Sequence, residues 1–170
     1  MIRRIAHYLI RKAERRVGVT LDYVHAIAET NIGLLSRYNR IFGIVDPRKH
    51  LPTDAYHAAR LRGALAADCG TCVEAEINLA LAAGLSQDWM HRVLTDQVKG
   101  DLNAVIVLKD AVVRDRIDAP DAREQVRSAY GDAGLIELSL AMNGAAFLPG
   151  VKRAMGYATA CNLEVMQQLK

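Results

Sequence analysis

The chain has 170 residues, of which 51% are apolar and 24% charged, and its formal net charge is +3. This composition excludes a disordered polymer, a collagen and a disulfide-stapled miniprotein, and the length suffices for one buried core. The net charge is too small to indicate nucleic-acid binding, so we expect no nucleic-acid partner. Only four prolines interrupt the chain, and the many alanines and leucines favour helices.

Residues 1–18 are basic and are predicted to form an amphipathic helix, with Ile2, Ile5 and Leu9 on one face. The sequence contains neither the uninterrupted apolar stretch of a secretory signal nor a run of about 18 uncharged apolar residues. The helix could lie on an anionic membrane, but its apolar face lacks Trp and Phe. We therefore expect it to dock on its own core or on a sister subunit, and we predict a cytoplasmic protein.

The following segments show helical periodicity, and strand alternation is nearly absent. The segment Phe42–Pro47 is typical of a linker. The predicted helices, roughly seven to nine in all, lie at about 20–28, 53–67, 69–84, 86–94, 101–113, from 120, from 131 to a break at Pro149, and 151–168. The sequence thus predicts an all-α fold and a single domain overall, in which residues 1–45 form a helical extension packed on the helical domain 46–170.

Two cysteines open the predicted helix 69–84, in the order Cys69-Gly70-Thr71-Cys72. Thiols three residues apart on a first helical turn face the same way. The unpaired backbone N–H groups and the dipole of a helix start favour an anion there. Such a setting can lower a thiol pKa from about 8.5 towards about 7. One sulfur would then be a nucleophile, and the other could resolve the resulting adduct.

Three other interpretations of this cysteine pair remain open. A structural zinc site takes four ligands, and the sequence has no second C-x-x-C, although Cys161 and a histidine could complete a set. Two buried, inert cysteines are a second possibility, and a structural disulfide, which we do not expect in a reducing compartment, is a third. We favour a redox dithiol without metal or cofactor, and we expect Cys161 to be a buried core thiol.

Two further side chains are candidates for the same site. Glu76 lies four residues after Cys72, on the same helical face. Its charge raises the pKa of a neighbouring thiol, but a carboxylate can also accept a proton or orient a histidine. His57 lies twelve residues before Cys69, so a helical hairpin could bring its imidazole over the dithiol. Alternatively, Glu76 is a solvated carboxylate and His57 a surface residue.

The run HAARLRGALAADCGTCVEAEINLALAAGLS, residues 57–86, resembles the signature of the carboxymuconolactone decarboxylase superfamily, and in particular its alkylhydroperoxidase D-like branch. That branch carries a glutamate, eleven residues, C-x-x-C, three residues and a histidine. Cys69 and Cys72 match the two cysteines, whereas His57 stands at the glutamate position and Glu76 at the histidine position. Residues 131–158 resemble the C-terminal helices of the family, so the resemblance covers roughly residues 50–165.

The resemblance implies an all-helical fold that assembles as a homo-oligomer, often a trimer or hexamer. It also implies the reduction of a peroxide or disulfide substrate by the dithiol, which an external dithiol restores. The expected function is therefore a thiol-dependent peroxidase or disulfide reductase, with Cys69, Cys72, Glu76 and His57 as catalytic residues. The alternative is a non-catalytic helical module, redox-sensing or structural, which the missing histidine at position 76 favours.

Overall fold

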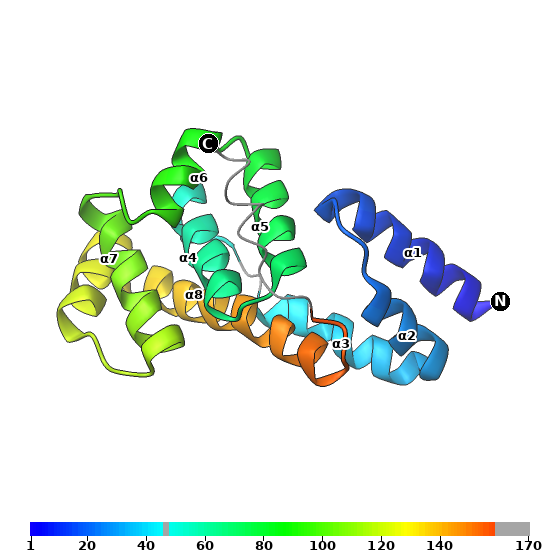
Figure 1. The fold of residues 1–170 in the computed structure, drawn as a ribbon. Coiled ribbons are helices and arrows are strands. Elements are labelled where there is room, and N and C mark those ends of the chain that lie inside the picture. The colour runs from blue at the N-terminus through cyan, green and yellow to red at the C-terminus, as the bar shows by residue number, and fades with distance from the viewer. Residues whose placement is uncertain (46–47, 159–170) are drawn as a thin grey trace.

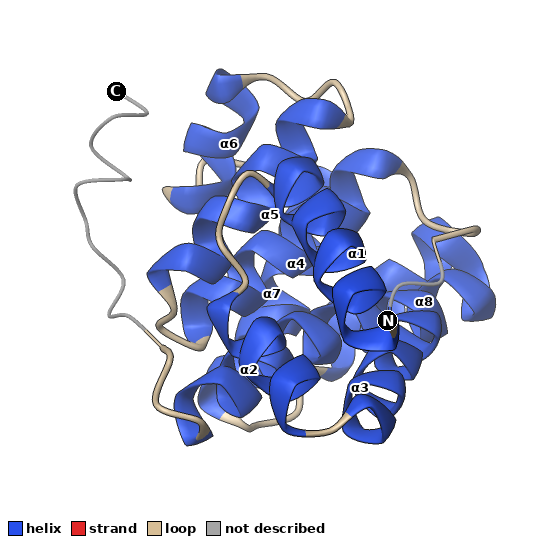
Figure 2. Ribbon diagram, turned by 90° about the vertical axis from the view of Figure 1, so that its right-hand side faces the viewer, coloured by secondary structure: helices blue, strands red, loops and turns tan. Residues whose placement is uncertain are grey.

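The computed structural model describes residues 1–45 and 48–158. In this part of the chain it contains eight α-helices, one π-helical segment and no strand, which confirms the predicted all-α class (Figure 2). The elements are α1 (Ile2–Val17), α2 (Asp22–Thr30), α3 (Ile32–Val45), α4 (Thr53–Ala66), α5 (Gly70–Ala82), α6 (Gln87–Leu94), α7 (Gly100–Lys109), η1 (Asp110–Asp115) and α8 (Pro120–Ala154).

Helix α4 is the centre of the fold, because it packs against α5, α6, α7 and α8. One face of α4 shares an apolar core with α7 and α8, and another face shares one with α5 and α6. Helices α1, α2 and α3 form a third core of their own at the end of the molecule opposite α6 and α7 (Figure 1). They join the rest of the protein through the contacts of α1 with α5 and of α3 with α8.

The predicted linker at Phe42–Pro47 is wrong over its first four residues, because α3 continues to Val45. Tertiary packing explains this continuation. Phe42 stacks edge-on against the ring of Tyr38, one turn earlier on α3. Val45 packs so closely on α8 that a Cβ added at Gly144 would lie 2.3 Å from the Cβ of Val45. The absence of a side chain at Gly144 therefore allows the last turn of α3 to pack against α8.

The predicted break at Pro149 is also wrong, because α8 runs through this proline to Ala154. Pro149 is buried, and its packing compensates for the backbone hydrogen bond that a proline cannot donate. The interruption lies instead at Gly131, whose φ of 70° and ψ of 176° produce a kink, as expected from the predicted helix start there. Most of the predicted helix 151–168, with Cys161, lies outside the described residues.

Within the described residues, α8 is the one helix long and apolar enough to cross a membrane by length and composition. The criterion tolerates a few charged residues, so it does not conflict with the lack of a run of about 18 uncharged apolar residues. Of its most apolar stretch, 44% is buried inside the protein, where it forms part of the core around α4. Core helices meet the same criterion, so the feature does not establish a location in the cell.

A carboxylate on α8 fixes the segment that leads into α4. Glu137 is buried, and its two oxygens accept hydrogen bonds from the backbone N–H groups of Lys49, His50 and Leu51 at 2.8–3.2 Å. Backbone amides that do not yet belong to a helix need such acceptors when they are buried. Glu137 therefore sets the position of the helix that carries His57.

We expect Glu137→Gln to lower the free energy of unfolding by about 2 kcal/mol, because an amide offers one acceptor oxygen and no charge to these three donors. Urea denaturation followed by circular dichroism measures the change. Glu124→Gln is the matched control, since Glu124 is exposed and pairs with Arg127 at the surface of the same helix. The control should change the stability by no more than about 0.5 kcal/mol. Equal stabilities of the two variants would contradict the role of Glu137.

A second buried polar cluster joins α4 to α7, away from the cysteines. Asp110 accepts hydrogen bonds from Arg62 on α4 and from Lys109, whose Nζ lies 2.6 Å from the carboxylate. Burial lowers the pKa of Lys109. Burial alone would raise the pKa of Asp110, but the hydrogen bonds from Arg62 and Lys109 bring it below its usual value. These charges compensate one another and stabilise the contact between the helices.

Candidate functional site

The two cysteines lie at the turn between α4 and α5. Asp68 has a φ of 48°, in the left-handed region, and Cys69 follows as the N-cap of α5. Arg153, near the end of α8, donates hydrogen bonds from Nη2 to the carbonyl oxygens of Ala67 and Asp68 at 2.9 and 2.5 Å. The end of a helix far along the sequence therefore holds the turn that presents the sulfurs.

The sulfur atoms of Cys69 and Cys72 lie 2.6 Å apart, and both cysteines are free. A disulfide bond is about 2.05 Å long, so a movement of about half an ångström would allow the bond to form. Cys69 has 0% exposure, whereas Cys72 is partly exposed and lines a cavity. A molecule that enters this cavity therefore meets Cys72 first, with Cys69 behind it.

The two thiols differ strongly in acidity. The hydrogen bond with Cys72 lowers the pKa of Cys69 to about 5 against the opposing effect of burial. The Thr71 hydroxyl, the backbone N–H of Cys72 and the positive charge of Lys152 act in the same direction. The hydrogen bond with Cys69, together with burial, raises the pKa of Cys72. The pair therefore holds one proton and one negative charge at neutral pH.

The sulfur that carries the negative charge is thus that of Cys69, whereas the sulfur that a molecule in the cavity can reach is that of Cys72. The negative charge belongs to the pair, because two thiols in contact titrate together rather than one by one. Transfer of the shared proton from Cys72 to Cys69 would move the negative charge to the sulfur that faces the cavity. The attacking sulfur can then be Cys72 even though Cys69 is the more acidic thiol.

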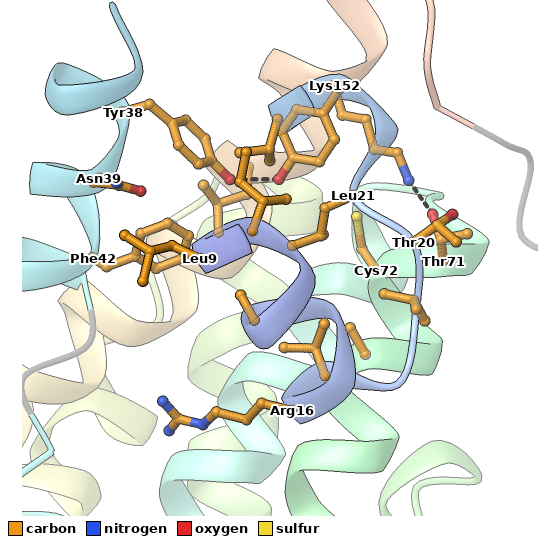
Figure 3. Close-up of a pocket in the computed structure, with 18 of the residues that line it drawn as sticks. Leu9, Arg16, Thr20, Leu21, Tyr38, Asn39, Phe42, Thr71, Cys72 and Lys152 are labelled. Carbon is orange, nitrogen blue, oxygen red and sulfur yellow. Dashed lines mark hydrogen bonds between the residues drawn. The ribbon is translucent and has the colours of Figure 1, made fainter. Parts of the chain in front are cut away.

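Lys152 supplies a buried positive charge that acts on the dithiol. Its Nζ donates a hydrogen bond to the Thr71 hydroxyl and lies 5.8 Å from the centre of the Tyr23 ring (Figure 3). The side chain belongs to α8 and is buried. Reasoning from the spacing of residues missed it, because 81 positions separate Lys152 from Thr71. Only the packing of the end of α8 on the start of α5 brings it to the dithiol.

Glu76 lies one turn after Cys72 and lines the same cavity, as the spacing predicts. Both of its carboxylate oxygens accept hydrogen bonds from Arg60 on α4, at 2.9 Å from Nε and 2.7 Å from Nη2. Arg60 also donates a hydrogen bond to the Tyr56 hydroxyl. Glu76 is therefore a buried, ion-paired carboxylate and not the solvated one that we weighed as an alternative.

His57 is buried on α4, one turn before Arg60, with its ring edge-on to Tyr56. It lines a second cavity whose described lining contains neither cysteine. The structure thus brings Glu76 to Cys72 and pairs it with Arg60, where the sequence analysis considered Glu76 as a group that could orient a histidine. Arg60 was missed, although its position three residues after His57 on one helical face was the available signal.

The cavity beside Cys72 has a volume of about 550 Å³. Apolar side chains of α1, α2 and α3 form one side, and α5 and α8 form the other (Figure 3). Within the first side, a hydrogen bond between the hydroxyls of Tyr23 and Tyr38 joins α2 to α3, and burial raises the pKa of both tyrosines. In Figure 3, Cys72 and Lys152 lie at one end of the cavity and Arg16 at the other. The segment 1–45 thus contributes one wall of the candidate site.

No group of three or more His, Cys, Asp or Glu side chains within residues 1–45 and 48–158 is arranged to hold a metal ion. The third cysteine, Cys161, lies beyond these ranges. The chain matches no family model, no curated protein and no solved structure.

Proposed function

We propose that the protein is a thiol-dependent peroxidase or disulfide reductase of the alkylhydroperoxidase D-like kind, and that it works through Cys69 and Cys72. One observation carries the proposal. Two free sulfur atoms lie 2.6 Å apart, share one negative charge and have a cavity on the side of Cys72. Low-pKa, accessible thiols next to a resolving thiol are the arrangement that peroxides oxidise selectively.

The proposed reaction begins when the Cys72 thiolate attacks the outer oxygen of a hydroperoxide. The O–O bond breaks, the sulfur becomes a sulfenic acid, and the leaving alkoxide takes up a proton to give an alcohol. The Cys69 thiol then condenses with the sulfenic acid, which forms the disulfide and releases water. An external dithiol reduces this disulfide by exchange through a mixed disulfide and is itself oxidised. In total, one hydroperoxide and one dithiol yield one alcohol, one water and one disulfide.

Glu76 and His57 have proton-handling roles in this proposal. The Glu76 carboxylate, one turn from Cys72, is proposed to mediate the transfer of the shared proton from Cys72 to Cys69, and Arg60 orients it. His57 is the proposed outer member of the relay, one helical turn from Arg60. If His57→Ala leaves the pKa of the dithiol unchanged, His57 does not belong to the site.

We expect hydrogen peroxide and an organic hydroperoxide each to remove two free thiols per chain from the purified, reduced protein. Titration with a thiol reagent counts them. Cys69→Ser and Cys72→Ser should each prevent the loss of a thiol pair, because no intramolecular disulfide can form. Cys161→Ser is the matched control and should still lose two thiols. The absence of peroxide-driven thiol loss in the unmodified chain would contradict the proposal.

A second candidate function is a helical redox-sensing or structural module that undergoes oxidation without turnover. The ion pair of Glu76 with Arg60 favours it, because a carboxylate held at both oxygens is a poor proton shuttle. Continuous consumption of peroxide in the presence of an external dithiol separates the two functions. The enzyme turns over many times, whereas the module stops after one oxidation per chain.

We also propose a homo-oligomer, a trimer or hexamer, in the reducing environment of the cytoplasm. Large apolar side chains are exposed along α8, at Ile136, Leu140 and Phe147. Copies of the chain could bury them against one another. A monomer at micromolar concentration in size-exclusion chromatography would count against this assembly. Helix α1 docks on the protein through the buried Ala6 and Ile10, whereas Ile2, Ile5 and Leu9 are exposed. We propose that a sister subunit and not a membrane covers these three side chains.

A further inference from the structure

We propose that the protein binds a single-chain amphiphile with an anionic head group. Its apolar tail would occupy the cavity beside Cys72, and its carboxylate or phosphate would occupy a second, cationic cavity that adjoins the first. The inference deepens the proposed function by naming the class of hydroperoxide that reaches the dithiol. It rests on the proposed function for the reaction only, since binding can be measured without any oxidation.

The second cavity also has a volume of about 550 Å³, and its lining is rich in positive charge. It is lined by Arg16, Arg48, Lys49, Tyr56, His57, Arg60, Leu79, Ala82 and Ala83. Four of these side chains are cations at neutral pH, and no carboxylate belongs to the described lining. Arginine and lysine side chains that converge on a cavity recognise carboxylates and phosphates.

Three of the four cations keep their charge available to a ligand. Arg60 is neutralised by Glu76, whereas Arg16, Arg48 and Lys49 form no ion pair with any residue in the described part of the chain. Among the described residues, Arg48 contacts neutral groups, the Thr53 hydroxyl at 3.4 Å and the face of the Tyr56 ring at 5.8 Å. An anion would therefore enter without displacing a carboxylate.

The two cavities meet, because Arg16, Arg60 and Leu79 line both of them. Arg16 lies at the end of α1, away from Cys72 and Lys152 (Figure 3). A head group held at Arg16 would thus direct its tail along the apolar face of α1 towards Cys72. Each volume lies within the range of about 300–1,000 Å³ typical of small-molecule sites. The chemistry of the walls matches an amphiphile and neither a plain alkane nor a free inorganic anion.

The test uses saturated ligands, so that binding is independent of the redox reaction. Isothermal titration calorimetry of the full, reduced chain would compare dodecanoate, dodecyl phosphate, dodecan-1-ol and inorganic phosphate below the critical micelle concentrations. We expect both anionic amphiphiles to bind at least tenfold more tightly than the alcohol. Inorganic phosphate alone should bind at least tenfold more weakly than dodecyl phosphate. The ratio of the two anionic amphiphiles shows whether the head-group site prefers a carboxylate or a phosphate.

Two kinds of variant assign the two ends of the ligand. The double variant Arg48→Ala, Lys49→Ala, at two positions that line only the second cavity, should bring dodecanoate to the affinity of the alcohol and leave alcohol binding unchanged. Lys12→Ala is the matched control, because Lys12 is an exposed cation on α1 that lines neither cavity. Ala13→Phe, which fills the tail cavity from an exposed position on α1, should weaken all three alkyl ligands at least fivefold.

Equal affinities of dodecanoate and the alcohol would overturn the inference, as would an unchanged affinity of the double variant for dodecanoate. Inorganic phosphate that binds as tightly as dodecyl phosphate would also overturn it, because the tail would then contribute nothing. These outcomes leave the proposed function intact if hydrogen peroxide still removes two thiols per chain. Conversely, an amphiphile that binds as expected to a chain whose thiols resist peroxide would support this inference and contradict the proposed function.

Discussion

Glu76→Gln is expected to lower the free energy of unfolding by about 3–5 kcal/mol, because removal of one partner from a buried ion pair costs about this much. The side chains of Arg60 and Glu76 are only 6% and 9% exposed, and two hydrogen bonds join them. The neutral amide can accept only one of these hydrogen bonds and offers no charge to the guanidinium. Urea denaturation followed by circular dichroism gives the change in stability.

Glu74→Gln is the matched control, since Glu74 lies on the same helix and is partly exposed. Its effect should stay within about 0.5 kcal/mol. The double variant Arg60→Met, Glu76→Leu should recover a large part of the lost stability, because it removes both charges and fills the space with apolar atoms. Should Glu76→Gln prove as stable as the unmodified chain, the ion pair would contribute little to the stability of the protein.

Lys152→Met is expected to raise the pKa of the first ionisation of the dithiol by about 1–3 units, since a nearby opposite charge shifts a pKa by this amount. At about pH 6 the rate of thiol alkylation should therefore fall about twofold for a shift of one unit and about tenfold for a shift of two units. The measurement is the pH profile of alkylation by iodoacetamide. Lys152→Arg keeps the charge and should retain most of the reactivity, and Lys99→Met removes an exposed charge away from the site.

The low pKa of Cys69 also makes the free energy of unfolding depend on pH. The pKa of Cys69 is about 5 in the folded protein and lies near 9.0 without the fold. The stabilisation from this ionisation therefore grows as the pH rises from about 5 to about 9, and above about pH 9 the raised pKa of Cys72 opposes it. Lys152→Met should flatten this dependence at acidic pH. An unchanged alkylation profile would contradict the role that we assign to Lys152.

The helical class and the position of the dithiol could be predicted from the sequence because both depend on local patterns. The helix expected at 69–84 is observed as Gly70–Ala82, with Cys69 as its N-cap. The helix expected at 86–94 is observed as Gln87–Leu94, and Ser86 caps it, since its hydroxyl accepts a hydrogen bond from the backbone N–H of Trp89. Helix starts and N-caps depend on three or four neighbouring residues, so the interactions within a single helical turn determine them.

The partners of the site could not be predicted in the same way, because they depend on which helices pack together. Arg60 reaches Glu76 from a neighbouring helix, and Lys152 reaches Thr71 from the far end of α8. Tertiary contacts also overrode local signals at Phe42 and Pro149, where the sequence favours a break and the packing maintains a helix. Spacing along the chain carries no information about such contacts.

Adjacent residues at the end of α8 have separate effects on the dithiol. Arg153 fixes the backbone of the turn, and Lys152 sets the charge around the sulfurs. Any substitution that rotates this end of the helix would alter the conformation of the turn and the reduction potential of the disulfide together. The two properties would consequently evolve as one trait, and homologues with a different sequence at this helix end should differ in both.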